Sequence, residues 1–391
     1  MDVIQNEMPI VIDGILEGEF ERRVSIQERV RVLPPLHWQG IDIYILDESS
    51  QMYTGSFKAF TALTCISDCL RKGIEEICFV SGANTGMALA AYANRLGIGT
   101  HFFIPVSNTW KLDTRYVGSP LSSVYAVEDP ASTKAICNEF AAKTDIPLMP
   151  ERDHHLIAGR KRGAIIFSLI RSGLKFDWFA QTVCAGFGPI GIYDFLLSFK
   201  EQDPAFEVPK FLGVQQLGNC ALVRYLLSRK MEFVAGTVGP SGQLIEEIMY
   251  DRHPETYGTF PLVEHVIRAS NGAMVTITNN ELANSLINTE KKHLVHEHLE
   301  CYNTRLQTMV RNRGIIEIVQ KAGFMAIAGV MEAVRARFIT EGQKVLCSFG
   351  AGASAGNFQP LPQDHILWIK KPYTLCLQDL VTAVKRGREV R

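Results

Sequence analysis

Short apolar runs that suit buried strands alternate with helical patterns along most of the chain. Strand-like runs are expected at 76–80, 101–106, 122–127, 145–149, 178–184, 211–215 and 344–349. Helical patterns are expected between them at 85–96, 111–116, 130–143, 190–200, 220–229 and 323–338. A strand–helix rhythm of this kind predicts an α/β fold with mostly parallel sheets and helices packed on them.

The domain organisation follows from the absence of an obvious linker in the sequence. No stretch rich in Pro, Gly or Ser divides the chain, so any two lobes are expected to be intertwined rather than arranged in series. We expect a larger lobe formed by residues 1–59 and 172–391 and a smaller, mobile α/β lobe formed by residues 60–171.

Composition and charge exclude several classes of partner. The 391 residues are 47% hydrophobic and carry a formal net charge of −1, which gives no long-range field to attract nucleic acid or an anionic membrane. The first 20 residues do not read as a secretion signal, and the most apolar stretches are too short to span a bilayer. Nine scattered cysteines fit reduced thiols. We therefore expect a cytoplasmic protein with no nucleic-acid or membrane partner.

Three segments carry candidate chemistry. The one nearest the C-terminus is a glycine turn between a strand and a helix. Residues 185–191 read Ala-Gly-Phe-Gly-Pro-Ile-Gly, a G-x-G-x-x-G pattern whose backbone N–H groups suit an anion. A dinucleotide site would also need an acid about twenty residues later, at the end of the next strand. Glu207 precedes that strand instead, so a mononucleotide-sized phosphate fits better, and a merely tight turn remains the alternative.

The other two segments are a polar loop and a lysine, each directly before an expected helix. Residues 81–86 read Ser-Gly-Ala-Asn-Thr-Gly and offer hydroxyls, an amide and N–H groups, which suit a carboxylate or an aromatic oxygen. Asn84 at a helix start is otherwise an N-cap. Lys58 ends the segment 54–58 and precedes an apolar helical face at 59–63, so we expect its amine to point into a site. Desolvation there would favour the neutral, nucleophilic amine.

These segments resemble the fold type II enzymes that depend on pyridoxal 5′-phosphate (PLP). This group includes threonine synthase, serine/threonine dehydratases and O-acetylserine sulfhydrylase. The likeness is greatest to threonine synthase, through Thr54–Lys58 and through the run 84–93, and it extends loosely from about Val32 to Gly352. The resemblance implies two intertwined three-layer α/β/α lobes and a bound PLP.

The resemblance also implies a role for each residue. Lys58 would bond covalently to PLP and move the α-proton, Asn84 would hydrogen-bond the phenolic oxygen, and Ser348 would face the pyridine nitrogen, with Ser354 in reserve. The segment holding the phosphate would consist of Gly186, Phe187, Gly188, Pro189, Ile190 and Gly191. The substrate carboxylate would be held by Ser81, Gly82, Ala83 and Thr85, and no metal is implied.

A hydroxyl at the ring nitrogen has a chemical consequence. A carboxylate there would keep the pyridine protonated and make it a deep electron sink, whereas a hydroxyl does not. The resemblance therefore implies β- or γ-elimination or replacement on a small amino acid, with phosphohomoserine or an activated serine such as O-phosphoserine as substrate. A homodimer is typical of the family. The alternative is a non-catalytic PLP-fold protein with a binding or regulatory role.

The substrate segment departs further from the family pattern than the cofactor segment. The family usually has Ser or Thr where Gly82 stands and Gly where Ala83 stands. Phe187 and Pro189 interrupt a run of glycines, and Pro189 removes one N–H donor. A phosphorylated substrate would need a second anion site, for which the candidates are Lys111, Arg115, Arg160 and Lys161.

Several other features have simpler interpretations. The histidines of the 293–298 segment lack the i, i+4 spacing of helical zinc sites, so a solvated helix face is expected. Cys65 and Cys69 have apolar neighbours and should pack in a core. The basic cluster at 160–162 reads as a surface patch, or else as help in binding an acidic substrate. Trp368 reads as a packed anchor before a frayed basic tail.

Overall fold

The computed structural model divides the chain into two units. It describes residues 8–11, 16, 18–26, 29–49, 51–236, 244–246, 249, 254–278, 318–319, 321–353 and 358–389. The first unit consists of Met1–Ile15, Gln27–Phe57 and His155–Asn357, and the second of Leu16–Ile26, Lys58–His154 and Phe358–Arg391. Residues 16–26, 58–59 and 358–391 thus fall in the second unit and 155–171 in the first, unlike the ranges expected from the sequence. The expected movement of one lobe stays a prediction.

The first unit is built on a large sheet. Its strands are β1 (Met8–Val11), β2 (Arg29–Trp38), β3 (Ile41–Asp47), β7 (Trp178–Thr182), β8 (Lys210–Gln216), β9 (Val234–Ala235), β10 (Ala273–Ile277), β11 (Ile318–Val319), β12 (Lys344–Phe349) and β13 (Gly352–Ala353). Its helices are most of α6 (Arg152–Arg171), α7 (Phe187–Gln202), α8 (Ala221–Ser228), the short 3₁₀ helix Pro254–Tyr257, α9 (Phe260–Ser270) and α12 (Lys321–Arg335).

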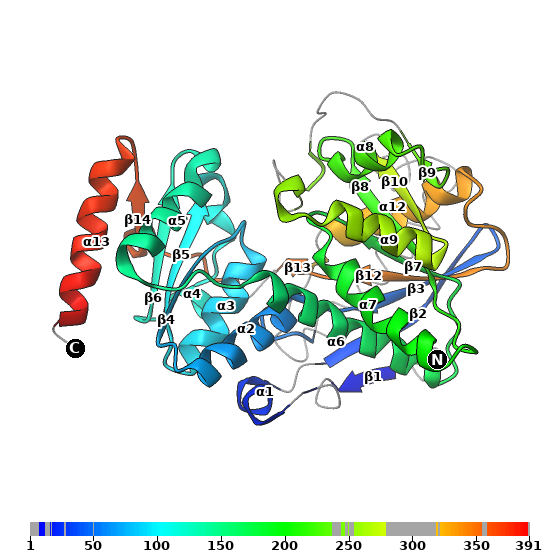
Figure 1. Ribbon diagram of the computed structural model, residues 1–391, viewed down its shortest axis with the longest axis horizontal. Helices are drawn as coiled ribbons and strands as arrows, with labels where there is room; N and C mark the ends of the chain where they lie inside the picture. The colour runs from blue at the N-terminus through cyan, green and yellow to red at the C-terminus, as the bar shows by residue number, and fades with distance from the viewer. Residues whose placement is uncertain are drawn as a thin grey trace. The chain divides into compact units, whose positions relative to one another are not determined.

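Eight of the described strands form a mostly parallel sheet between two helical layers, and β11 and β13 form a separate antiparallel pair. The described strands pair in the order β1-β2-β3-β12-β7-β8-β10-β9, and every pair from β3 onward is parallel. Strand β7 is buried along its whole length, as a central parallel strand covered on both faces must be. Helix α12 packs on one face of the sheet, and α9 packs on β8 and on α7 (Figure 1).

The second unit repeats this plan on a smaller scale. Its strands are β4 (Glu76–Val80), β5 (Gly99–Pro105), β6 (Ser122–Val127) and β14 (Ile366–Ile369). Its helices are α1 (Gly18–Val24), α2 (Lys58–Lys72), α3 (Asn84–Arg95), α4 (Thr114–Val117), α5 (Thr133–Thr144), α13 (Tyr373–Glu389) and the 3₁₀ helices Val106–Lys111, Pro130–Ser132 and Gln363–His365.

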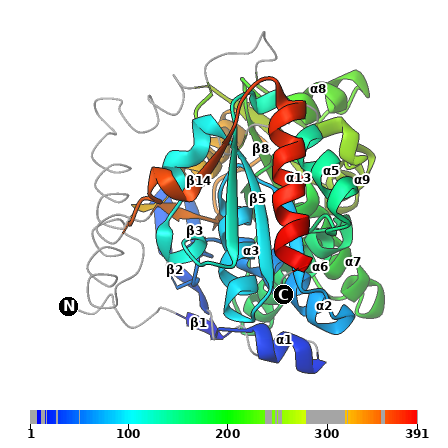
Figure 2. The same ribbon diagram turned by 90° about the vertical axis from the view of Figure 1, so that its left-hand side faces the viewer.

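Its described strands form a fully parallel sheet in the order β14-β6-β5-β4. Helix α5 packs on the sheet and α13 packs on α5, while α3 packs on β5 and α2 on α3. Figure 2 shows α13, in red, beside α5 and the strands of this sheet. The predicted α/β fold with mostly parallel sheets is therefore confirmed.

Three local expectations are wrong. Residues 145–149 form no strand but a single bridge between Leu148 and Cys78, because Pro147 lacks the N–H that a sheet ladder requires. Trp368 is 39% exposed, and its neighbours Ile366 and Ile369 are the buried residues of β14. The basic tail is not frayed, because it forms α13 as far as Glu389.

The long helix α6 was not expected from the sequence, because two glycines and three basic residues interrupt its apolar pattern. Among the described residues, no helix combines the length and apolar character needed to cross a bilayer.

Candidate functional site

Lys58 begins helix α2, and the residues before it are fixed against the end of β12. The Phe57 N–H donates to the Gly350 carbonyl at 2.8 Å, and Ser56 forms an antiparallel bridge with Ala351. A Cβ at Gly350 would lie 2.2 Å from the Phe57 ring, so this close approach requires glycine. The backbone leading into Lys58 is thus tied to the carboxyl end of a central strand.

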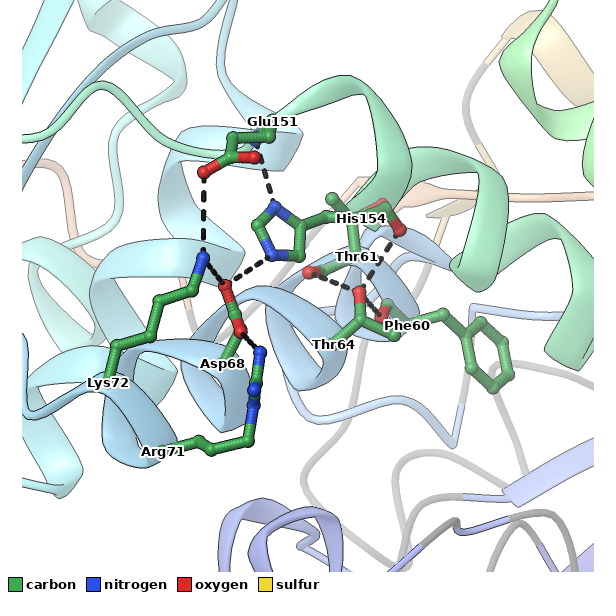
Figure 3. Close-up of polar contacts among 8 residues, drawn as sticks. All are labelled: Phe60, Thr61, Thr64, Asp68, Arg71, Lys72, Glu151 and His154. Carbon is green, nitrogen blue, oxygen red and sulfur yellow. Dashed lines mark hydrogen bonds and ion pairs between the residues drawn. The ribbon is translucent and has the colours of Figure 1, made fainter.

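Further along α2, a cluster of polar side chains joins this helix to the start of α6 (Figure 3). His154 Nδ1 accepts a hydrogen bond from the Glu151 N–H at 2.9 Å, which leaves the hydrogen on Nε2 to be donated to Asp68 at 3.2 Å. Lys72 pairs with Asp68 at 2.6 Å and with Glu151 at 3.8 Å. The Thr64 hydroxyl lies 3.1 Å from the His154 carbonyl.

The charge on Asp68 is stabilised by these neighbours. Partial burial opposes ionisation, but hydrogen bonds from Lys72, Arg71 and His154 outweigh it and lower the pKa of the Asp68 carboxyl. The cluster therefore holds α2, and with it the position of Lys58, against the first turn of α6.

The loop at residues 81–86 joins β4 to α3, and the N-cap position of this helix is Ala83 rather than Asn84. Ser81 Oγ accepts hydrogen bonds from the N–H groups of Ala83 at 3.2 Å and Gly86 at 3.0 Å. Asn84 is the first residue of α3. Ala83 has φ +156° and ψ −69°, a conformation that L-residues rarely adopt and that favours glycine. The loop is thus strained at Ala83, and its role in binding a carboxylate stays a prediction.

The glycine turn joins β7 to α7. Gly186 adopts a left-handed conformation with φ +88°, and a Cβ there would lie 2.7 Å from Val263. Phe187 and Gly188 occupy the first turn of α7, where N–H groups have no intrahelical acceptor. Pro189 has no N–H, and the Ile190 N–H donates to the Gly186 carbonyl at 3.2 Å. The turn therefore offers fewer free donors than its sequence pattern suggests.

Gly191, the last predicted residue of this turn, lies against helix α6. A Cβ at Gly191 would lie 2.2 Å from the Leu156 carbonyl oxygen, and a Cβ at Gly159 would lie 2.8 Å from the Gly191 Cα. A Cβ at Gly163 would lie 2.7 Å from the Ile192 carbonyl oxygen. The glycines that obscured α6 in the sequence are the ones that let it approach α7 closely.

Ser348, at the carboxyl end of β12, belongs to a buried charged network that the sequence did not reveal. Its hydroxyl donates to Glu48 Oε2 at 2.7 Å and accepts from Arg162 Nη2 at 3.1 Å. Arg162 also donates from Nε and Nη2 to the two Glu48 oxygens, each at 2.6 Å. Glu48 is 0% and Arg162 1% exposed. The guanidinium stacks on the Phe57 ring, with its Cζ 4.3 Å from the ring centroid.

The surface interpretation of the basic cluster at 160–162 is wrong for two of its members. Arg162 and Lys161 are buried, and of the three residues Arg160 alone is exposed, in an ion pair with Asp194. Arg115, another candidate for a second anion site, makes a forked ion pair with Asp113. Arg115 and Arg160 are thus already balanced by carboxylates within their own units.

The remaining sequence interpretations divide into two groups. Cys65 and Cys69 are fully buried, which confirms that they pack in a core. Ser354 and the histidines at 293, 296 and 298 lie outside the described residues. Among the described residues, no group of three or more His, Cys, Asp and Glu could hold a metal ion.

The first unit also collects buried polar atoms around its predicted site residues. Within the described part of the chain, the Thr54 and Ser56 hydroxyls, Arg162 Nη1, Gln181 Oε1 and the Thr259 hydroxyl are buried and have no hydrogen-bond partner. Such atoms are costly unless a ligand or water satisfies them. The three hydroxyls and Arg162 Nη1 can donate to a ligand that carries an anionic group, whereas Gln181 Oε1 can only accept a hydrogen bond.

Residues 30–289 match the family described as pyridoxal-phosphate dependent enzyme. The chain belongs to this family. The buried donors of the first unit, the lysine at the start of α2 and the glycine turn fit its cofactor, pyridoxal 5′-phosphate. A comparison with curated protein sequences gives no significant match.

Solved structures of the family share the fold. O-acetylserine dependent cystathionine β-synthase from Helicobacter pylori is 18% identical, with a TM-score of 0.55 over 86% of this chain and 96% of that one. Maize serine racemase is 15% identical, with a TM-score of 0.56 over 88% and 96%. Threonine deaminase isoform 2 from Solanum lycopersicum is 18% identical, with a TM-score of 0.53 over 83% and 84%. At these identities the likeness shows the fold.

The predicted site residues of this PLP-dependent enzyme are distributed over both units. The glycine turn and Ser348 lie in the first, and Lys58 and the 81–86 loop in the second. Sequence reasoning missed Glu48 and Gln181, and it assigned Arg162 to the surface. The sequence held a weak signal for Glu48, because this acidic residue directly follows the largely apolar strand β3.

Proposed function

We propose that this PLP-dependent enzyme catalyses β- or γ-elimination or replacement on a small amino acid, as threonine synthase-like enzymes do. The proposed substrate is phosphohomoserine or an activated serine such as O-phosphoserine. Bound PLP would supply the electron withdrawal that weakens bonds at the substrate α-carbon.

The observation that carries this proposal is the pairing of Glu48 with Arg162 beside Ser348. A carboxylate presented alone to the ring nitrogen would favour a protonated ring and, with it, transamination. Both Glu48 oxygens instead accept hydrogen bonds from Arg162, so the acidic group beside Ser348 is neutralised within the protein. The Ser348 hydroxyl would then face the ring, and it would donate to the ring nitrogen by turning its single hydrogen away from Glu48 Oε2. A hydroxyl at that position supports expulsion of a leaving group from the adjacent carbon.

The other residues have roles that follow from their positions. Lys58 would hold the cofactor covalently and move the proton of the substrate α-carbon, and Asn84 would bind the phenolic oxygen. The loop at 81–86 would bind the substrate carboxylate, and the glycine turn would bind the cofactor phosphate. The fold leaves the reaction type open, because the similar structures are a synthase, a racemase and a deaminase by name. Racemisation, deamination and β-replacement all begin with removal of the α-proton.

A non-catalytic PLP-binding or regulatory role is the second candidate, and one observation favours it. The N–H groups of Ala83 and Gly86, which would be offered to a substrate carboxylate, already donate to Ser81 Oγ. Binding of a carboxylate would require this hydroxyl to rotate or exchange partners.

The first test concerns the covalent link to the cofactor. The purified protein should show a near-visible absorption band that borohydride abolishes, and mass spectrometry should then find the pyridoxyl group on Lys58. Lys58→Ala should lose the label, whereas Lys321→Ala, at a lysine outside the segment 54–58, should retain it. A label on any lysine other than Lys58 would contradict the assignment.

The second test concerns the reaction. The holoenzyme should be screened with amino acids and with their O-phospho and O-acetyl derivatives, recording the cofactor band and the release of phosphate, acetate or keto acid. Release from a phosphorylated or acetylated substrate supports elimination or replacement. Inversion of the α-carbon without release would indicate a racemase. If PLP is bound but no amino acid changes the band, the binding-protein candidate replaces the enzyme.

A further inference from the structure

Two buried donors approach the glycine turn from outside it. A Cβ placed on Gly188 would lie 3.1 Å from Arg162 Nη1 and 3.1 Å from Gln181 Nε2. Arg162 comes from α6 and is 1% exposed, and Gln181 comes from β7 and is 6% exposed. Both atoms carry N–H groups, so the first turn of α7 is bordered by hydrogen-bond donors on this side.

Arg162 has binding capacity that its known contacts do not use. Nε and Nη2 are occupied by Glu48 and Ser348, and the flat face of the guanidinium stacks on the Phe57 ring. Nη1 has no hydrogen-bond partner among the described residues. The guanidinium is thus fixed on three sides and presents its remaining N–H groups next to Gly188.

The same turn lacks one donor that an anion would need. Pro189 has no N–H, while the Ile190 N–H makes the ordinary helical hydrogen bond to the Gly186 carbonyl. Thr259 adds a fully buried hydroxyl that has no partner in the described part of the chain and lies 3.7 Å from a Cβ placed on Gly186. The N-terminus of α7, a cation and neutral donors therefore converge where an anion would be stabilised.

We propose that Arg162 and Gln181 bind the phosphate group of PLP and replace the donor that the glycine turn lacks at Pro189. The inference rests on the proposed role of this turn as the phosphate site. Arg162 then contributes the N–H groups of Nη1, on a charged guanidinium, to a group that is otherwise held by backbone N–H groups. Glu48 is the positioning residue that holds the guanidinium in place and balances its charge while the site is empty.

Helix packing explains how a residue of α6 reaches this turn. Gly159 and Gly163 contact the backbone of α7 around Gly191 and Ile192, which brings the two helices close together. Arg162 lies between these two glycines on α6 and is carried towards the start of α7. The position of the Arg162 guanidinium thus depends on a close helix contact at which only glycine fits.

The experiment compares PLP with pyridoxal, which lacks the phosphate, in titrations of the full-length protein freed of cofactor. Replacing Arg162 alone would leave the buried Glu48 carboxylate without its cation, so the main variant is the neutral pair Glu48→Gln/Arg162→Gln. Gln181→Leu removes the second donor with little change in volume. The matched control is Arg160→Gln, two residues away on the same helix in an exposed ion pair.

The expected result is a selective loss of phosphate binding. The Glu48→Gln/Arg162→Gln variant should bind PLP about 10- to 100-fold more weakly, the range for hydrogen bonds to a charged group, and pyridoxal with nearly unchanged affinity. Gln181→Leu should show a smaller loss, again for PLP alone. Arg160→Gln should bind both ligands as the parent protein does.

Other outcomes would overturn the proposal in distinguishable ways. An equal loss for PLP and pyridoxal would mean that the network acts on the ring through Ser348, and unchanged PLP affinity would mean that Arg162 does not contact the phosphate.

Gly188→Ala separates these results from a failure of the phosphate site itself. If Gly188→Ala weakens PLP binding and the neutral pair does not, the glycine turn is still supported as the phosphate site, but the proposed role of Arg162 is refuted. If neither affects PLP binding, the phosphate site is elsewhere. Should the neutral pair fail to fold by circular dichroism, Gln181→Leu decides alone.

Discussion

An alanine at Gly191 should force helices α6 and α7 apart. The new Cβ would lie 2.2 Å from the Leu156 carbonyl oxygen, 2.8 Å from the Gly159 Cα and 3.0 Å from the Arg160 nitrogen. Ordinary van der Waals contact begins near 3.4 Å, so relief of the closest contact requires a shift of about 1 Å. All three atoms belong to helical backbone, so no side-chain rotation can make room.

The cost follows from two opposing effects. Overpacking of a rigid contact costs about 1–3 kcal/mol, and this site belongs at the upper end because only backbone can move. Replacement of glycine by alanine inside a helix returns roughly 1 kcal/mol through helix propensity. We therefore expect Gly191→Ala to lower the free energy of unfolding by about 2 kcal/mol.

The assay is urea denaturation followed by circular dichroism, with a matched control on another helix. A Cβ on Gly387 in α13 would meet nothing within 4 Å, so Gly387→Ala should leave the midpoint unchanged or raise it. Gly159→Ala should resemble Gly191→Ala, and the double variant should cost less than the sum, because the helices need to separate once. A midpoint for Gly191→Ala at or above that of the parent protein would refute the packing argument.

Two further predictions concern the second unit. Because the Asp68 pKa is lowered in the folded protein, its stabilisation is present above the unfolded-state pKa and is lost as the pH falls. Asp68→Asn should therefore lower the unfolding midpoint at pH 7, and its difference from the parent protein should shrink below about pH 4, which urea titrations across this range would measure. Ala83→Gly should raise stability by roughly 1 kcal/mol in the same assay, since glycine adopts the +156° φ without strain. A loss of stability in Ala83→Gly would show that the methyl packing outweighs the strain.

The elements that the sequence predicted share a strong local signal. β4 and β6 have the predicted bounds, and α7 follows the glycine turn as expected. These segments are short apolar runs or periodic patterns bounded by turn residues, so local preference and tertiary packing agree. No strand forms at 145–149, although its apolar residues favour one, because Pro147 lacks the N–H group that a sheet ladder requires.

The charged network could not be read from the sequence because its partners are distant along the chain. Glu48, Arg162 and Ser348 are separated by 114 and 186 residues, and no local rule pairs them. Helix α6 was missed for a related reason. Gly159 and Gly163 weaken any helical pattern, and their role appears only when the backbone of α7 is in place beside them.

The Glu48–Arg162 pair is easier to explain as part of a site than as part of a core. Removal of two charges from water costs several kcal/mol for each ion, and well-packed apolar residues often give equal or better stability at such positions. Arg31 and Asp47, on neighbouring strands, form a second buried pair at 2.9 Å, in which Asp47 also accepts from the Ser49 hydroxyl. The Glu48–Arg162 pair differs because Arg162 keeps one nitrogen without a partner among the described residues, at the edge of the glycine turn. A core has no use for such an unsatisfied donor, whereas a phosphate site does.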